Sequence, residues 1–149
     1  MNWESIRCRY FSRVCREELS AELSTHGLDE ESETWEGGIV YRAVRIFVEI
    51  SYDLESSPRY RCTVVIGFGA NTDENARRRQ AIPLWYAIPI SRPEYNYPPW
   101  RFMNEDDLRA VLRRLSDELF EGFVYPLVLD ESALEQLVTK FRADNGLPK

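Results

Sequence analysis

Three ionisable side chains recur every four residues in the N-terminal part of the chain, namely Glu18, Glu22 and His26. On an α-helix this spacing places them on one face, where two carboxylates and an imidazole could bind a metal ion or act as an acid–base pair. His26 is the only histidine, so no second imidazole can complete a common zinc or iron site. We therefore expect a solvated helix face, with His26 near the negative end of the helix dipole.

A partial nucleotide-binding pattern lies in the middle of the chain. The apolar run that ends in Gly67-Phe68-Gly69 is similar to the start of a dinucleotide fingerprint, in which a strand leads through a glycine-rich turn into a helix. Thr72 stands where the third glycine is needed, so we expect instead a strand end at which glycines allow a bulge or turn. A nucleotide or anion bound in this region would contact Gly67, Gly69, Arg77, Arg78 and Arg79.

The residue types that act as nucleophiles form no catalytic pattern. Cys8, Cys15 and Cys62 have no CxxC spacing, and Cys15 falls on an apolar helix stripe rather than at the helix N-terminus that favours a thiolate. No GxSxG motif is present for serine catalysis. We expect buried free thiols, and we predict a protein that is not an enzyme and uses neither a metal nor a cofactor.

A second basic group falls on a predicted helix near the C-terminus and consists of Arg109, Arg113 and Arg114. Together with the cluster at 77–79, these side chains could bind a phosphate or another acidic ligand through bidentate hydrogen bonds. Alternatively, they neutralise acidic segments such as 29–33 or 104–107. Exposed ion pairs are common and weak, so we expect neutralisation.

The segment 82–100, IPLWYAIPISRPEYNYPPW, contains five of the eight prolines and five of the nineteen aromatic residues. Proline restricts the backbone, and large aromatic side chains are enriched among the residues that dominate binding energy at interfaces. The alternative is a loop that caps the sheet and buries its own rings. Five rings exceed what one small sheet end needs, so we predict a partner-binding surface formed by Trp85, Tyr86, Tyr95, Tyr97 and Trp100.

The chain carries a net charge of −6 at pH 7. Nucleic-acid binding depends on neutralising phosphates, so nucleic acid is an unfavourable partner, whereas a basic protein would be attracted. We expect the acidic segment 29–38 to steer such a partner through Asp29, Glu30, Glu31 and Glu33. No apolar run approaches the roughly 20 residues that span a bilayer, and the N-terminal residues lack the apolar block of a signal peptide, which predicts a cytoplasmic protein without membrane contact.

Three helices are predicted from apolar residues spaced three or four apart. The first covers 3–26 and stops at Gly27, which can adopt the left-handed conformation. The second starts after the cap residue Asn104 and ends at Gly122. The third begins near Asp130, where Ser132 and Glu135 have capping-box spacing, and it stops at Gly146. Residues 124–129, around Pro126, are predicted to be extended or irregular.

Alternating apolar residues predict two antiparallel strands, one with Val44, Ile46, Val48 and Ile50 on its buried face and one over 60–68. The short connection between them favours a hairpin. Residues 82–90 are predicted to form an edge strand, because prolines at 83 and 89 cannot donate to a ladder, and 91–100 a loop. These elements predict a single α+β domain over residues 1–149: a three- to four-stranded antiparallel sheet with an N-terminal helix and two C-terminal helices on one face.

This layout resembles that of small acidic bacterial proteins of the toxin–immunity type, and type III secretion chaperones share its size and acidity. The resemblance lies in the layout, and the proline-rich segment departs from it, so it assigns no residue. It implies a non-enzymatic cytosolic protein-binding module, an immunity or inhibitor protein for a basic partner. Two alternatives stay open: a small-ligand or nucleotide-binding protein that uses 67–69 and 77–79, and a secretion-chaperone-like or structural subunit. The oligomeric state is left open.

Overall fold

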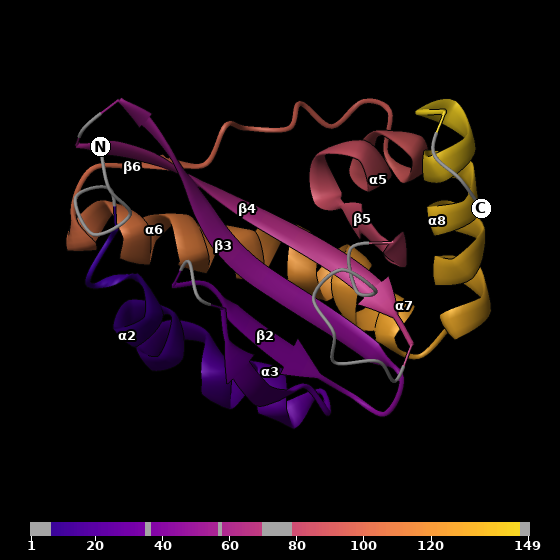
Figure 1. The fold of residues 1–149 in the computed structure, drawn as a ribbon, viewed down its shortest axis with the longest axis horizontal. Coiled ribbons are helices and arrows are strands. Elements are labelled where there is room, and N and C mark those ends of the chain that lie inside the picture. The colour runs from indigo at the N-terminus through magenta and orange to yellow at the C-terminus, as the bar shows by residue number, and fades with distance from the viewer. Residues whose placement is uncertain (1–6, 35–36, 57, 70–78, 147–149) are drawn as a thin grey trace.

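The structure is a computed structural model that describes residues 7–34, 37–56, 58–69 and 79–146. It has an α+β fold, in which an antiparallel sheet packs against an N-terminal helix and a group of C-terminal helices (Figure 1). Alternate side chains of the central strands share one large apolar core with side chains of both groups of helices. Among the described residues, no helix is long and apolar enough to cross a bilayer.

The sheet has six strands, so the prediction of three or four was too low. They pair in the order β1-β2-β3-β4-β5, and β6 pairs with β4 beside β5. Every pairing is antiparallel. The strands are β1 (Asp29–Glu33), β2 (Ile39–Arg42), β3 (Ile46–Ser56), β4 (Arg59–Phe68), β5 (Ala81–Pro83) and β6 (Arg101–Phe102).

The strands that sequence patterning missed are short or polar. β1 has the sequence DEESE and was expected to be an acidic loop, but it pairs with β2 from Asp29 opposite Arg42 to Glu33 opposite Ile39. β6 has two residues. Neither strand shows the apolar alternation by which half-buried strands are recognised. All residues of β1 are polar, and β6 is set by pairing with β4, which lies far earlier in the sequence.

The predicted hairpin is confirmed as β3 and β4, which pair from Ile46 opposite Phe68 to Ser56 opposite Arg59. Val48 and Ile50 point into the core, as their alternation predicts. The prediction for Val44 was wrong. Val44 lies in the turn between β2 and β3, where its side chain is 92% exposed.

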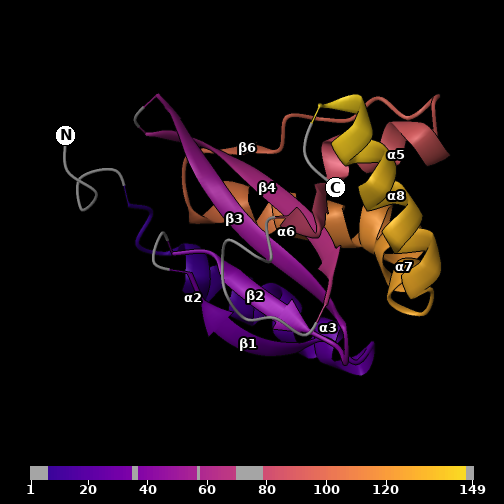
Figure 2. The same ribbon diagram turned by 45° about the vertical axis from the view of Figure 1, so that its right-hand side comes forward.

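The N-terminal helix is confirmed from Phe11 to Thr25 and consists of three consecutive pieces: α2 (Phe11–Cys15), the π-helical segment η1 (Arg16–Ser20) and α3 (Ala21–Thr25). Residues 7–10, which were predicted to belong to it, lie before its first turn and are not helical. The predicted stop is also confirmed. Gly27 has a φ of +81°, and the backbone N–H of Leu28 donates to the carbonyl of Leu23 at 2.9 Å, which is the closing bond expected when a glycine ends a helix. Figure 2 shows this helix behind β1 and β2.

The C-terminal helices run longer than predicted. Asn104 caps α6 as expected, because its side chain accepts from the N–H of Asp107 at 2.8 Å, but the chain stays helical through Gly122 and Pro126. Pro126 is the second residue of a helix that follows the preceding π-helical segment without a break, so the prediction of an extended or irregular segment over 124–129 was wrong. Asp130, rather than the predicted pair of Ser132 and Glu135, caps the last helix. These helices are α6 (Glu105–Leu115), the π-helical η2 (Ser116–Val124), α7 (Tyr125–Val128) and α8 (Glu131–Asp144).

The proline-rich segment does not form the predicted strand over 82–90. Only β5 is extended, at the edge of the sheet as expected, and it is followed by the helix α5 (Leu84–Ser91). Pro83 is the cap residue of that helix, a position that contributes no intrahelical N–H bond. α5 and α8 lie beside each other at one end of the sheet (Figures 1 and 2).

A substitution at Gly67 would test how closely the sheet is packed. A Cβ atom at this position would overlap the Phe47 ring and lie 2.6 Å from the carbonyl oxygen of Gln80. Gly67→Ala should therefore destabilise the fold by about 1–3 kcal/mol, as overpacking in a core does, measured by urea unfolding.

Gly122→Ala is the matched control, since the nearest group to a Cβ there is the Arg92 guanidinium at 3.8 Å. It should leave the free energy of unfolding unchanged or raise it. Equal stabilities for the two variants would contradict the close packing at Gly67.

Candidate functional site

The aromatic residues predicted to bind a partner are mostly packed inward. Trp100 is only 3% exposed and belongs to the main core. Its carbonyl accepts from the N–H of Cys62 at 2.9 Å, and the guanidinium of Arg114 lies 4.9 Å from its ring centre. Trp100 also adopts a φ of 53°, which is rare for a residue with a side chain. It is a buried structural residue and offers no surface to a partner in this structure.

Three of the four remaining rings are half-buried. Tyr97 packs edge-on against Trp100, with ring centres 6.1 Å apart, and burial raises the pKa of its hydroxyl. Tyr95 donates to Glu118 at 2.9 Å, and burial together with this bond raises its pKa to about 12. Tyr86 packs on Phe141 and donates to Asp144. Tyr95 and Tyr86 are therefore fixed against helices of the C-terminal group, and Tyr97 against Trp100.

Trp85 alone among the five is largely exposed, at 53%. It lies on α5, whose Ile90 is 39% exposed. The segment thus buries most of its own rings, as in the alternative interpretation, but against the main core rather than in a satellite core. It leaves one tryptophan for contact with other molecules.

The acidic residues of β1 are largely neutralised within the chain. Arg16 binds Glu30 through two nitrogens, at 2.9 and 3.1 Å, and also lies 3.2 Å from Glu33. Glu31 pairs with Arg42, and Asp29 accepts from the hydroxyl of Ser24 at 2.7 Å. Hydrogen bonds from Ser12 and then Arg16 lower the pKa of Glu33. Steering by this segment is accordingly weaker than its sequence suggests, because each paired charge cancels much of the outward field.

The nucleotide-binding alternative finds little support in the described residues. Gly67 pairs within the sheet with Phe47 and Ala81, and all strands beside β4 are antiparallel, whereas the fingerprint requires a parallel βαβ unit. Gly69, at a φ of +112°, donates to the carbonyl of Arg45 at 2.6 Å. The carbonyl of Arg79 accepts from Arg142 at 2.9 Å. Arg77 and Arg78 lie outside the described residues.

The helix face that was predicted to be solvated is only partly so. Its two carboxylates, Glu18 and Glu22, bond to side chains of the C-terminal helices. Glu18 binds Arg109 and Arg113, each at 3.0 Å, and Glu22 accepts from the Ser116 hydroxyl at 2.6 Å. His26 stays exposed at the end of α3. Within the described ranges, no three His, Cys, Asp or Glu side chains are placed to hold a metal ion.

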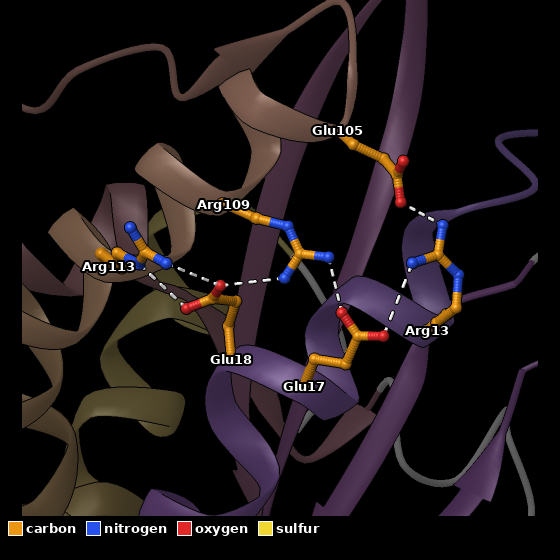
Figure 3. A network of polar contacts seen from close by, with 6 residues as sticks. All are labelled: Arg13, Glu17, Glu18, Glu105, Arg109 and Arg113. Carbon is orange, nitrogen blue, oxygen red and sulfur yellow. Dashed lines mark hydrogen bonds and ion pairs between the residues drawn. The ribbon is translucent and has the colours of Figure 1, made fainter.

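Arg109 and Arg113 of α6 neutralise acidic groups, as expected. The carboxylates that they bind belong to the N-terminal helix, not to the predicted segments 29–33 or 104–107. Figure 3 shows Arg109 between Glu17 and Glu18, with Arg113 on the far side of Glu18. At the other end of the same network, Arg13 contacts both Glu17 and Glu105. Hydrogen bonds from Arg113 and Arg109 lower the pKa of Glu18. The network joins the N-terminal helix to α6, so these arginines are structural.

The cysteines are buried and free, as predicted. Burial raises the pKa values of all three thiols, that of Cys62 to about 12. Deprotonation is therefore suppressed at neutral pH, and the thiols pack as small apolar groups.

Sequence reasoning missed a surface at the end of the sheet where α3 and α7 meet. Val44 and Leu129 are its most exposed apolar residues, at 92% and 88%. They line one hollow of about 440 Å³, together with His26 and the ion pair of Arg45 and Glu131, whose atoms are 3.2 Å apart. A second hollow of about 520 Å³ shares His26 and Leu129. We define the end surface by the residues Thr25, His26, Val44, Glu121, Pro126 and Leu129.

The base of the second hollow is an aromatic pair. His26 stacks on Tyr125 with ring centres 3.5 Å apart and an interplanar angle of 5°. Tyr125 is 5% exposed, and its hydroxyl is buried. Burial raises the pKa of this hydroxyl, and the charges of Glu22 and Glu121, together with a hydrogen bond to Glu22, add to the effect. Both carboxylates therefore lie near one buried hydroxyl.

Comparison with known proteins finds no match: no family model, no curated protein and no solved structure is similar to this chain. The function must therefore be inferred from the chain's own geometry.

The contrast between Trp100 and Trp85 is testable. Trp100→Ala should lower the free energy of unfolding by about 3–5 kcal/mol, as expected for removal of a buried tryptophan. Trp85→Ala, on the exposed face of α5, should stay within about 0.5 kcal/mol of the wild type. Chemical denaturation of both variants measures the difference, and a small effect at Trp100 would contradict its place in the core.

Glu18 should make stability depend on pH. Its pKa is lowered in the folded state, so its contribution is present above the unfolded value of about 4.3 and is lost as the pH falls through the lower folded value. Glu18→Gln should lower Tm at pH 7, by about 3 °C for a 1 kcal/mol loss, and the difference should shrink in acid.

Glu135→Gln is the control for this titration. Glu135 is exposed on α8, with no ion pair among the residues that the structure describes, so its variant should follow the wild type at each pH. A loss of Tm at Glu18 that did not change with pH would show that the carboxylate charge is not what stabilises the network.

Proposed function

We propose that this chain is a non-enzymatic protein-binding module that contacts its partner through the end surface. The observation that carries the proposal is the exposure of two large apolar side chains, Val44 and Leu129, on the rim of one hollow. Single exposed apolar residues are ordinary, whereas apolar residues gathered beside concave surface are typical of interaction sites.

The end surface is built on short, restrained connections. Val44 lies in the turn between β2 and β3, where the N–H of Ala43 donates to the carbonyl of Ile46 at 2.8 Å. Leu129 and Asp130 close α7, through bonds to the carbonyls of Pro126 at 3.2 Å and Leu127 at 3.0 Å. Contact side chains held on such turns lose little backbone entropy when they bind.

We further propose that the partner is a basic protein. A net charge of −6 favours a basic protein, which is consistent with an immunity or inhibitor protein that covers a basic surface. The aromatic anchors proposed from sequence are reduced to Trp85, because Trp100 is buried and Tyr86, Tyr95 and Tyr97 are bonded or packed within the fold. A structural subunit would use the same end surface to bind a neighbouring subunit.

The end surface can be tested by affinity capture from the native host. Val44→Asp combined with Leu129→Asp should reduce recovery of the specific partner at least 30-fold, because about 2 kcal/mol is the loss typical of an interface hot spot. Recovery is quantified by mass spectrometry against wild-type bait, and the Tm of the variant is measured in parallel.

Two further variants make the result specific. Met103→Asp changes a residue 48% exposed before α6 and should leave recovery unchanged, whereas Trp85→Ala tests the aromatic surface on α5. Loss of the partner with Trp85→Ala, and its retention with the Val44 and Leu129 variant, would move the binding surface to α5 and refute the end surface.

A further inference from the structure

Two carboxylates at this end of the molecule, Glu22 behind the end surface and Glu121 within it, have no cationic partner among the residues that the structure describes. Most acidic groups of the N-terminal helix and β1 are paired with arginine, as at Glu17, Glu18 and Glu30. Glu22, by contrast, is bonded to the hydroxyl of Ser116. Glu121 is exposed and has no bonded or ion-paired partner in the described part of the chain. Negative charge is therefore left uncompensated at this end of the molecule.

The groups around these carboxylates suit a cation. Glu121 lines the second hollow together with Tyr125 and His26, so a guanidinium or ammonium group that entered the hollow could form a charge-assisted hydrogen bond with the Glu121 carboxylate. The hydroxyl of Tyr125 is buried, and the charges of Glu22 and Glu121 both act on it, so the negative potential of the two carboxylates reaches the same part of the molecule.

The apolar residues around the hollow indicate whether the cation is a free ion or part of a peptide. Leu129 and Pro126 line the same hollow, and Val44 lies beyond Leu129 in the adjoining one. A free metal ion would gain nothing from this apolar rim. A peptide segment with a basic side chain next to apolar side chains would match both the charge and the apolar contacts.

We propose that the end surface binds a basic–apolar segment of a protein partner, with a lysine or arginine side chain seated in the second hollow beside Glu121. This inference rests on the proposed function and specifies the chemistry of the partner. Apolar residues next to the basic one contact Leu129 and Val44. Glu22 acts from behind the hollow by adding negative potential.

The test uses a library of random 12-residue peptides displayed on phage and selected against the full chain, with counter-selection against Leu129→Asp. Enriched peptides should contain lysine or arginine flanked by aliphatic or aromatic residues. For synthetic copies, Glu121→Lys should weaken binding at least tenfold. Glu94→Lys, the same charge change in the 92–100 segment, should alter binding less than twofold.

A double-mutant cycle assigns the contact. Replacing the peptide's basic residue by methionine and changing Glu121→Gln should each weaken binding, and the second change should add little once the first is made, because the two groups act on one interaction. Additive losses would overturn the proposed pairing with Glu121.

The remaining outcomes separate the two proposals. Peptides that need Leu129, lack a basic residue and ignore Glu121 would refute the basic–apolar segment while leaving the end surface as a protein-binding site. If no enriched peptide depends on Leu129, both proposals fail.

Discussion

The position of every strand beyond the first three depends on β4. This one strand pairs with β3 along its whole length, with β5 near its end and with β6 near its start. Strands lie on both sides of β4, and at Gly67 the neighbouring groups come very close. Gly67 pairs with Phe47 on one side and Ala81 on the other, and it has no side chain that would overlap the Phe47 ring. Because β6 leads directly into α6, the register of β4 also places the helix that carries Arg109 and Arg113 against the N-terminal helix.

Local patterns predicted the parts of this fold whose stabilising contacts are local. The N-terminal helix, its stop at Gly27 and the hairpin of β3 and β4 follow from apolar spacing and one glycine. β1 was not predicted because all five of its residues are polar, and it is held by pairing with β2 and by ion pairs with Arg16 and Arg42. The burial of Trp100 was not predicted because the Cys62 N–H that binds its carbonyl is far away in sequence.

The candidate site was missed because its residues looked like core residues. Val44 continues the alternation of Ile46 and Val48, and Leu129 ends the apolar run VYPLVL. Periodicity identifies apolar residues but cannot show where a chain turns before the last of them is covered. Both residues lie just outside a regular element, Val44 before β3 and Leu129 after α7. Exposed apolar contacts arise at such boundaries, where the element that would have buried them has ended.

The distribution of charge is governed by pairing more than by composition. The densest acidic run in the sequence lies around β1, yet Arg16 and Arg42 bind its glutamates and reduce its effect on an approaching molecule. The arginines of α6 similarly neutralise Glu17 and Glu18. An excess of six negative charges must then be carried by carboxylates without a cation. Glu121 is one of these, and it lies beside exposed apolar side chains and an aromatic pair. Unpaired charge next to uncovered apolar surface is the combination that places the proposed binding surface here rather than at the acidic run or the aromatic run of the sequence.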